Sequence, residues 1–164
     1  MAEKQFSKQE INEQYFEVLG KVGLIVHLSQ LIEYNVSNIL AFDDLLDKFN
    51  DNDKMYSFEY EQFKKQAEKL YKTLSSKPMG ACLAKAKDVH FFTKDSDDRL
   101  RLMCDERNWA VHRLFKEDLE LRHLETDPIF YFDRLENIID DMNAINQELI
   151  KIFENQKQKY NCIW

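Results

Sequence analysis

"YFDRLENIIDDMNAINQELIKI", residues 131–152, carries the clearest structural signal in the chain. Its apolar residues follow alternating steps of four and three: Tyr131, Leu135, Ile138, Met142, Ile145, Leu149 and Ile152. This heptad repeat predicts a helix that buries one narrow face against neighbouring helices. A bundle within the chain is the commoner result of such a pattern, and a helix pair across a dimer is the alternative. The preceding "TDP" predicts the start of this helix, with Thr126 as its cap and Pro128 in its first turn.

The other end of the chain predicts a second long helix. Ser7 and Glu10 have the spacing of a capping box, in which each side chain binds the backbone amide of the other residue. Helical spacing of apolar residues then continues to about Phe49. Gly20 and Gly23 lie inside this helix, where glycine is unfavourable, so they predict a bend or a close helix contact.

Shorter helices are expected between the two long ones, at 58–75, 80–91 and 97–119. A polar loop at 93–98 offers Asp95 or Ser96 as the cap of the third of these helices. Three glycines and two prolines are too few for a turn-rich β architecture. We therefore expect an all-α fold, an up-and-down bundle of about five helices that forms one domain over residues 1–164.

The charge and cysteine content restrict the function. A net charge of −7 argues against general binding of nucleic acid or of an anionic membrane, so any contact with nucleic acid has to be local. Cys82, Cys104 and Cys162 are odd in number and include no CxxC pair, which predicts neither a disulfide framework nor a zinc site. The chain begins without an apolar signal region, and its uninterrupted apolar runs are short. These features predict a cytoplasmic protein with no membrane partner.

An arginine stands in an unexpected place in "CDERNWAVHRLF", residues 104–115. On an α-helical wheel the neighbours of Arg107 are all apolar or nearly so: Leu100, Met103, Cys104, Ala110, Val111 and Leu114. Burying an unpaired guanidinium is costly, because arginine does not lose its charge. Three interpretations are open. Arg107 pairs with a carboxylate of another helix, extends its head to water, or holds an anion such as a phosphate.

A compact polar strip lies beside this arginine. Asn108 and His112 are four residues apart and therefore adjacent on a helix surface, with Asp105 on the same strip. Relative to Arg107, the wheel places Asn108 at about 100° and His112 at about 140°. The helix thus brings a cation, an amide and an imidazole to neighbouring positions.

The segment "RNWAVH", Arg107-Asn108-x-x-x-His112, resembles the R-polar-x(3–5)-H signature of HEPN domains. These domains are all-helical bundles found in ribonuclease toxins, abortive-infection proteins and RNA-targeting immune effectors. The expected order of helices is also similar, since the motif follows a long first helix and precedes a long last one. The resemblance implies an endoribonuclease that needs no metal or other cofactor, acting as a toxin or in antiviral defence.

The resemblance also implies a role for each motif residue. His112 would transfer a proton, since an ordinary imidazole titrates near neutral pH. Arg107 would stabilise negative charge on the phosphorane oxygens, and Asn108 would orient His112 or the phosphate. One histidine does not easily serve as both acid and base. The implied solution is a homodimer that brings two motifs into one cleft, with Trp109 contributing apolar surface beside them.

The implied partners are RNA, a second copy of the chain, and an antitoxin or other partner protein. Arg101, Arg113 and Lys116 flank the motif and are candidates for binding the RNA. The alternative function is a non-catalytic helical module that binds a partner protein or a nucleotide, with Arg107 in a structural ion pair. Glu120-x-x-His123 has the spacing of half a di-iron site, but the sequence lacks the second half, so no metal site is expected.

Overall fold

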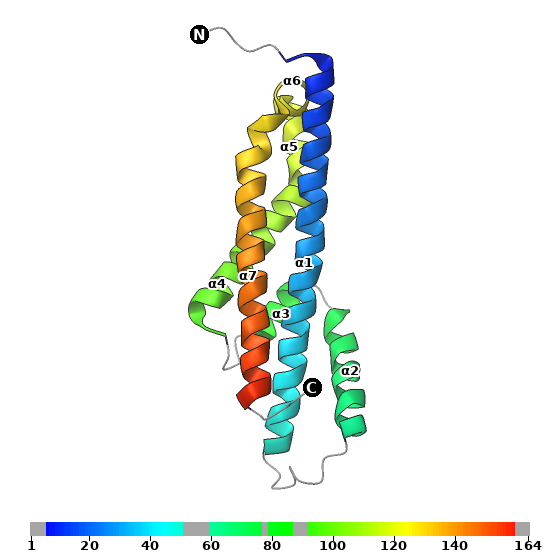
Figure 1. Cartoon of the computed structure of the whole chain (residues 1–164), viewed down its shortest axis with the longest axis vertical. Coiled ribbons are helices and arrows are strands. Elements are labelled where there is room, and N and C mark those ends of the chain that lie inside the picture. Colours follow the sequence, from blue (N-terminus) through cyan, green and yellow to red (C-terminus); the bar gives the residue numbers. More distant parts are fainter. Residues whose placement is uncertain (1–5, 51–59, 77–78, 87–91, 160–164) are drawn as a thin grey trace. The chain divides into compact units, whose positions relative to one another are not determined.

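The computed structural model describes residues 6–50, 60–76, 79–86 and 92–159, and within these ranges the regular structure is entirely helical (Figure 1). The all-α prediction is confirmed. The elements in chain order are α1 Lys8–Asn50, α2 Tyr60–Ser75, α3 Met79–Ala86, α4 Lys94–Asn108, the π-helix η2 Trp109–Arg113, α5 Leu114–Leu121, α6 His123–Thr126, the 3₁₀ helix η3 Pro128–Tyr131 and α7 Phe132–Lys159. The end of the helix expected at 80–91 falls outside the described residues.

Contacts divide the chain into two compact units, each made of separate stretches of sequence. The first unit contains Met1–Ser29 and Leu102–Ala144, and the second contains Gln30–Arg101 and Ile145–Trp164. Helices α1, α4 and α7 each contribute to both units. The single domain expected from the sequence stays a prediction.

In the first unit, the beginning of α1 lies along the beginning of α7. Tyr131, Leu135, Ile138 and Met142 from the heptad repeat are buried, as are Val18 and Ile25 on α1. Lys21 connects the two helices: its Nζ is 2.7 Å from Glu136 Oε1 and 5.1 Å from the centre of the Phe132 ring. The apolar face of α7 is therefore covered by the chain itself.

The second unit repeats this arrangement with the remaining parts of the same two helices. Asn35 Nδ2 donates to Asn146 Oδ1 over 2.7 Å, and Gln156 Nε2 donates to the carbonyl of Ile39 over 3.1 Å. Ile145 and Leu149 are buried, and Ile152 is half-buried. The buried heptad residues pack within the chain itself, as the bundle interpretation of the repeat predicts.

Of the three helix caps predicted from the sequence, the structure confirms one and contradicts two. Ser7 N–H donates to Glu10 Oε2 over 2.8 Å, and Glu10 N–H donates to Ser7 Oγ over 3.3 Å, as the capping box predicts. The motif helix begins earlier than expected, at Lys94. Thr93 Oγ1 accepts the Ser96 amide over 3.1 Å, so Thr93 is the cap in place of Asp95 or Ser96.

The start of the last helix also differs from the prediction. Thr126 does not cap it, because this residue ends α6, where its Oγ1 donates to the carbonyl of Arg122 over 2.9 Å. Pro128 opens a 3₁₀ turn, and the α-helical part begins at Phe132. The fixed φ of proline suits this tight first turn.

Two glycines in α1 face open space. A Cβ added at Gly20 or Gly23 would meet nothing within 4 Å, so the expected close helix contact is not formed among the described residues.

Helix α1 contains, within Lys8–Asp43, an 18-residue window of mean hydropathy 1.3, of which 28% is buried. By length and composition alone this window could cross a membrane, a property that core helices of soluble proteins share. Isolated polar residues interrupt the window, so it contains no long uninterrupted apolar run.

Candidate functional site

The Arg107–Asn108–His112 motif lies where the helix changes its winding. Helix α4 ends at Asn108, and the next turn, Trp109–Arg113, is a π-helix in which the Leu114 N–H binds the Trp109 carbonyl five residues back. The prediction of an uninterrupted α-helix over 97–119 is therefore wrong for Trp109–Arg113. Single π turns accommodate one extra residue and are frequent at functional sites.

The apolar stripe predicted around Arg107 is confirmed. Leu100, Met103, Ala110 and Leu114 are buried, and Cys104 and Val111 are half-buried. Arg107 itself is half-buried within this stripe. Its Nε atom is buried without a hydrogen-bond partner, while its Nη1 donates to Asn108 Oδ1 over 3.0 Å. The stem of the side chain thus lies in apolar packing, and the outer end of the guanidinium reaches the surface.

Arg107 makes no ion pair with any residue in the described parts of the chain. The interpretation as a structural ion pair has no support within those parts. Its Nη2 also makes no hydrogen bond there, so the guanidinium keeps unused donors. An arginine that extends its head to water and an arginine that holds a transient anion both fit this geometry.

His112 and Asn108 are exposed. The His112 imidazole has no hydrogen-bond partner among the residues that the structure describes. A π turn, with its i→i+5 hydrogen bonds, rotates through a smaller angle per residue than an α-helix. The π turn therefore rotates His112 towards the face that carries Arg107, from the roughly 140° that separates them on an α-helix.

Trp109 differs from the expectation that it forms exposed surface for a dimer. It is only 4% exposed, and its indole Nε1 donates to Glu117 Oε2 over 2.8 Å. The guanidinium carbon of Arg134 lies 3.4 Å from the centre of the indole, a cation–π contact. An α-helical wheel places Trp109 opposite the apolar stripe, but α7 supplies Arg134 to cover it.

The residues around this indole form a group connected by hydrogen bonds and ion pairs, the Trp109 cluster: Glu106, Trp109, Arg113, Glu117 and Arg134. The Nη2 and Nε of Arg134 donate to Glu106 Oε2 over 3.0 and 3.3 Å. The Trp109 hydrogen bond, together with the hydrogen bond and charge of Arg113 and the charge of Arg134, lowers the pKa of Glu117 although burial opposes the shift. Sequence reasoning missed the cluster because Arg134 lies on a helix distant along the chain.

The basic side chains proposed to bind RNA are largely neutralised. Arg113 Nη2 is 2.9 Å from Glu117 Oε1, and Arg101 Nε is 2.9 Å from Asp97 Oδ2. Both are pairs four residues apart, a spacing that is readable in the sequence. Lys116 is exposed and has no partner in the described ranges. Arg101 belongs to the second unit, whereas the motif belongs to the first.

A buried carboxylate that the sequence did not reveal closes the turn after α5. Asp118 accepts the Leu124 amide over 3.1 Å and the Tyr131 hydroxyl over 2.8 Å. Burial, with the bond to Asp118, raises the pKa of Tyr131 far above its ordinary value. Arg122, in the left-handed conformation with φ 58°, ends the helix between them. This network of hydrogen bonds therefore stabilises the turn between α5 and η3.

His123, from the possible half of a di-iron site, stacks on the Phe130 ring with the ring centres 3.8 Å apart. Among the described residues no group of three or more histidines, cysteines, aspartates or glutamates is placed to hold a metal ion.

Comparison of the sequence with family models and with curated proteins, and of the structure with solved structures, found no match. Interpretation of the motif therefore depends on its residues and their geometry.

Proposed function

We propose that the protein is a metal-independent endoribonuclease of the HEPN type, a cytoplasmic toxin or defence effector that acts as a homodimer. The observation that carries the proposal is the state of Arg107. Its guanidinium is held in apolar packing, pairs with no carboxylate of the described residues, and keeps unused donors. A planar cation in this condition is suited to a phosphate that arrives and leaves.

The reaction would need only the groups that two such motifs supply. One His112 removes the proton of an RNA 2′-hydroxyl, and the resulting oxygen attacks the adjacent phosphorus. The bond to the 5′-oxygen breaks, and that oxygen takes a proton from the His112 of the second copy. The products are a 2′,3′-cyclic phosphate and a 5′-hydroxyl. Arg107 stabilises the negative charge that accumulates on the non-bridging oxygens.

The hydrogen bond from Arg107 to Asn108 indicates what the side-chain amide of Asn108 does in the site. Because Asn108 Oδ1 accepts from Nη1, Asn108 fixes the direction of the guanidinium. The side-chain NH₂ of Asn108 then remains available to the phosphate. Asn108 therefore acts as a positioning residue for Arg107 rather than for His112.

The direct test is cleavage of single-stranded RNA by purified protein in the presence of EDTA. Wild type should produce 2′,3′-cyclic phosphate ends, and His112→Ala should lower the rate by about 10²–10⁴ while its helical circular dichroism stays intact. His27→Ala is a matched control, because His27 is also exposed and belongs to the same unit. Equal cleavage by wild type and His112→Ala would reject the proposal.

One observation favours the alternative, a non-catalytic module that binds a nucleotide or a partner protein. Arg101 and Arg113, which would attract a long RNA, are already paired with carboxylates. On this alternative, wild type cleaves no RNA but binds a mononucleotide at Arg107. Calorimetric titration with a nucleoside monophosphate, with Arg107→Met as the control, separates the two functions.

A further inference from the structure

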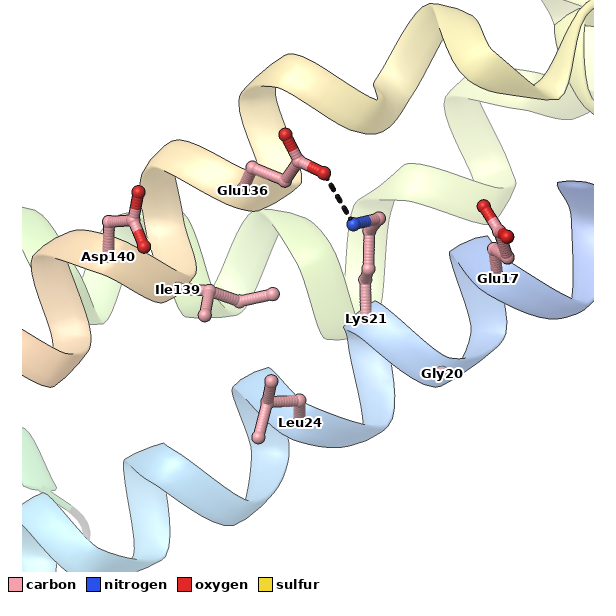
Figure 2. Close-up of a pocket in the computed structure, with 7 residues that line it drawn as sticks. All are labelled: Glu17, Gly20, Lys21, Leu24, Glu136, Ile139 and Asp140. Atoms are coloured by element: carbon pink, nitrogen blue, oxygen red, sulfur yellow. Dashed lines mark hydrogen bonds and ion pairs between the residues drawn. The ribbon is translucent and has the colours of Figure 1, made fainter.

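An open groove runs between α1 and α7 in the first unit (Figure 2). Its volume is about 550 Å³, and the residues that line it are Glu17, Gly20, Lys21, Leu24, Glu136, Ile139 and Asp140. None of them belongs to the Arg107–Asn108–His112 motif or to the Trp109 cluster. The groove combines an apolar floor with charged edges, a composition typical of a surface that receives another polypeptide.

The floor is apolar and accessible. Leu24 is 42% exposed and Ile139 is half-buried, and Figure 2 shows both side chains in the space between the helices. Gly20 has no side chain, and a Cβ added there would meet nothing within 4 Å. Phe16, one turn before Gly20, is 69% exposed and extends the apolar surface. A partner's backbone can therefore approach α1 closely at Gly20.

The edges of the groove carry a net negative charge. Lys21 is its one cation among the lining residues and is neutralised by Glu136, with Nζ and Oε1 2.7 Å apart. Glu17 and Asp140 make no ion pair or hydrogen bond with any described residue. Two unpaired carboxylates beside an apolar floor attract a cationic partner and repel the phosphates of RNA or of an anionic membrane.

We propose that this groove binds a cationic amphipathic helix of a partner protein. The apolar face of that helix would lie on Leu24 and Ile139, and its lysine or arginine side chains would pair with Glu17 and Asp140. A helix fits better than an extended strand, because two helices form the groove and the described residues contain no sheet edge for a strand to join. This interaction is independent of the proposed nuclease activity.

The first test uses a fluorescent leucine–lysine peptide of about four helical turns, with its leucines on one face, and measures fluorescence anisotropy with the full chain. Glu17→Lys/Asp140→Lys should weaken binding by about tenfold or more. The matched control is Glu120→Lys/Glu125→Lys, which changes the net charge equally at two exposed carboxylates of the same unit. It should weaken binding by no more than about twofold, the effect of long-range charge alone.

A second variant separates binding from folding. Gly20→Gln places a side chain in the groove without changing the charge, and it replaces glycine by a better helix former. It should raise the thermal stability of the protein and weaken peptide binding about tenfold. Gly80→Gln, on α3, also meets nothing within 4 Å at its Cβ and should leave peptide affinity unchanged. A damaged fold therefore cannot imitate the predicted result.

The position of the peptide is checked by methyl NMR. The δ1-methyl signal of Ile139 should shift on titration, whereas that of Ile150, also on α7 and 39% exposed, should not. Failure of the peptide to bind, or equal affinity of all variants, would overturn the proposal. Binding of the groove to vesicles of phosphatidylcholine, or self-association in ultracentrifugation that Gly20→Gln abolishes, would assign it to a different occupant and also overturn it.

Discussion

Two arginines of the first unit meet opposite conditions. Arg134 donates to Glu106 and stacks on the Trp109 indole, so its charge is paired and one face of its guanidinium is covered. Arg107 lies in an apolar stripe with one amide as its partner, and its Nε is buried without a hydrogen bond. The guanidinium of Arg134 therefore connects two helices of the fold, whereas that of Arg107 is a cation with unused hydrogen-bond donors.

The difference has an energetic consequence. A buried donor without a partner costs about 1–3 kcal/mol, so the fold gains nothing from the guanidinium of Arg107 that an apolar side chain would not provide. A side chain that is unfavourable for the fold is expected where function requires it. The Trp109 cluster, by contrast, should contribute to stability and little to chemistry.

The largest predicted effect is on the activity of an Arg107 variant. Arg107→Met should lower the rate of RNA cleavage by about 10²–10³, because the charge that stabilises the phosphorane is lost. Its free energy of unfolding in urea should stay equal to that of wild type or rise, because the orphaned Nε is removed. A large loss of stability would show that Arg107 is a structural residue.

The converse is predicted for Arg134. Arg134→Met should lower the free energy of unfolding by about 1–2 kcal/mol, a modest value because the side chain is half-exposed and solvent weakens its ion pair. The folded fraction should cleave RNA at nearly the wild-type rate. If Arg134→Met loses activity and keeps stability, the assigned roles of the two arginines are reversed.

How much of this comparison is readable in the sequence depends on the range of the interactions. The heptad of α7 and the apolar stripe around Arg107 follow from local periodicity, and both were predicted correctly. The π turn was missed because a helical wheel assumes about 100° per residue throughout. The burial of Trp109 was missed because Arg134 comes from another helix, and the cap at Thr93 because several polar residues compete in that loop.

A smaller effect is expected at the turn after α5, which Asp118 closes. Tyr131→Phe removes the hydroxyl that donates to Asp118 and should lower the free energy of unfolding by about 1 kcal/mol. Because the pKa of Tyr131 is raised in the folded state, this contribution is complete below about pH 10 and is lost as the pH rises above it. Urea titrations of wild type and variant at several alkaline pH values measure both effects. Parallel curves at every pH would contradict the assignment.

The smallest effect is a change in one pKa. Trp109→Phe removes the hydrogen bond that is the largest cause of the lowered pKa of Glu117, so that pKa should move up towards its ordinary value. The lowered value means that Glu117 stabilises the fold above about pH 4 and ceases to do so as the pH falls through the folded-state pKa. Carboxyl NMR titration measures the shift. An unchanged pKa in Trp109→Phe would assign the lowering to Arg113 and Arg134 instead.

On the proposed mechanism, Arg107 and His112 act on the same phosphodiester. The most direct measurement records the imidazole NMR signals of the protein while a short RNA with 2′-fluoro groups, which cannot be cleaved, is added. We expect the His112 signals to shift in wild type but not in Arg107→Met, and the His27 signals to stay in place in both. Unchanged His112 signals in wild type, or an equal shift in Arg107→Met, would contradict it.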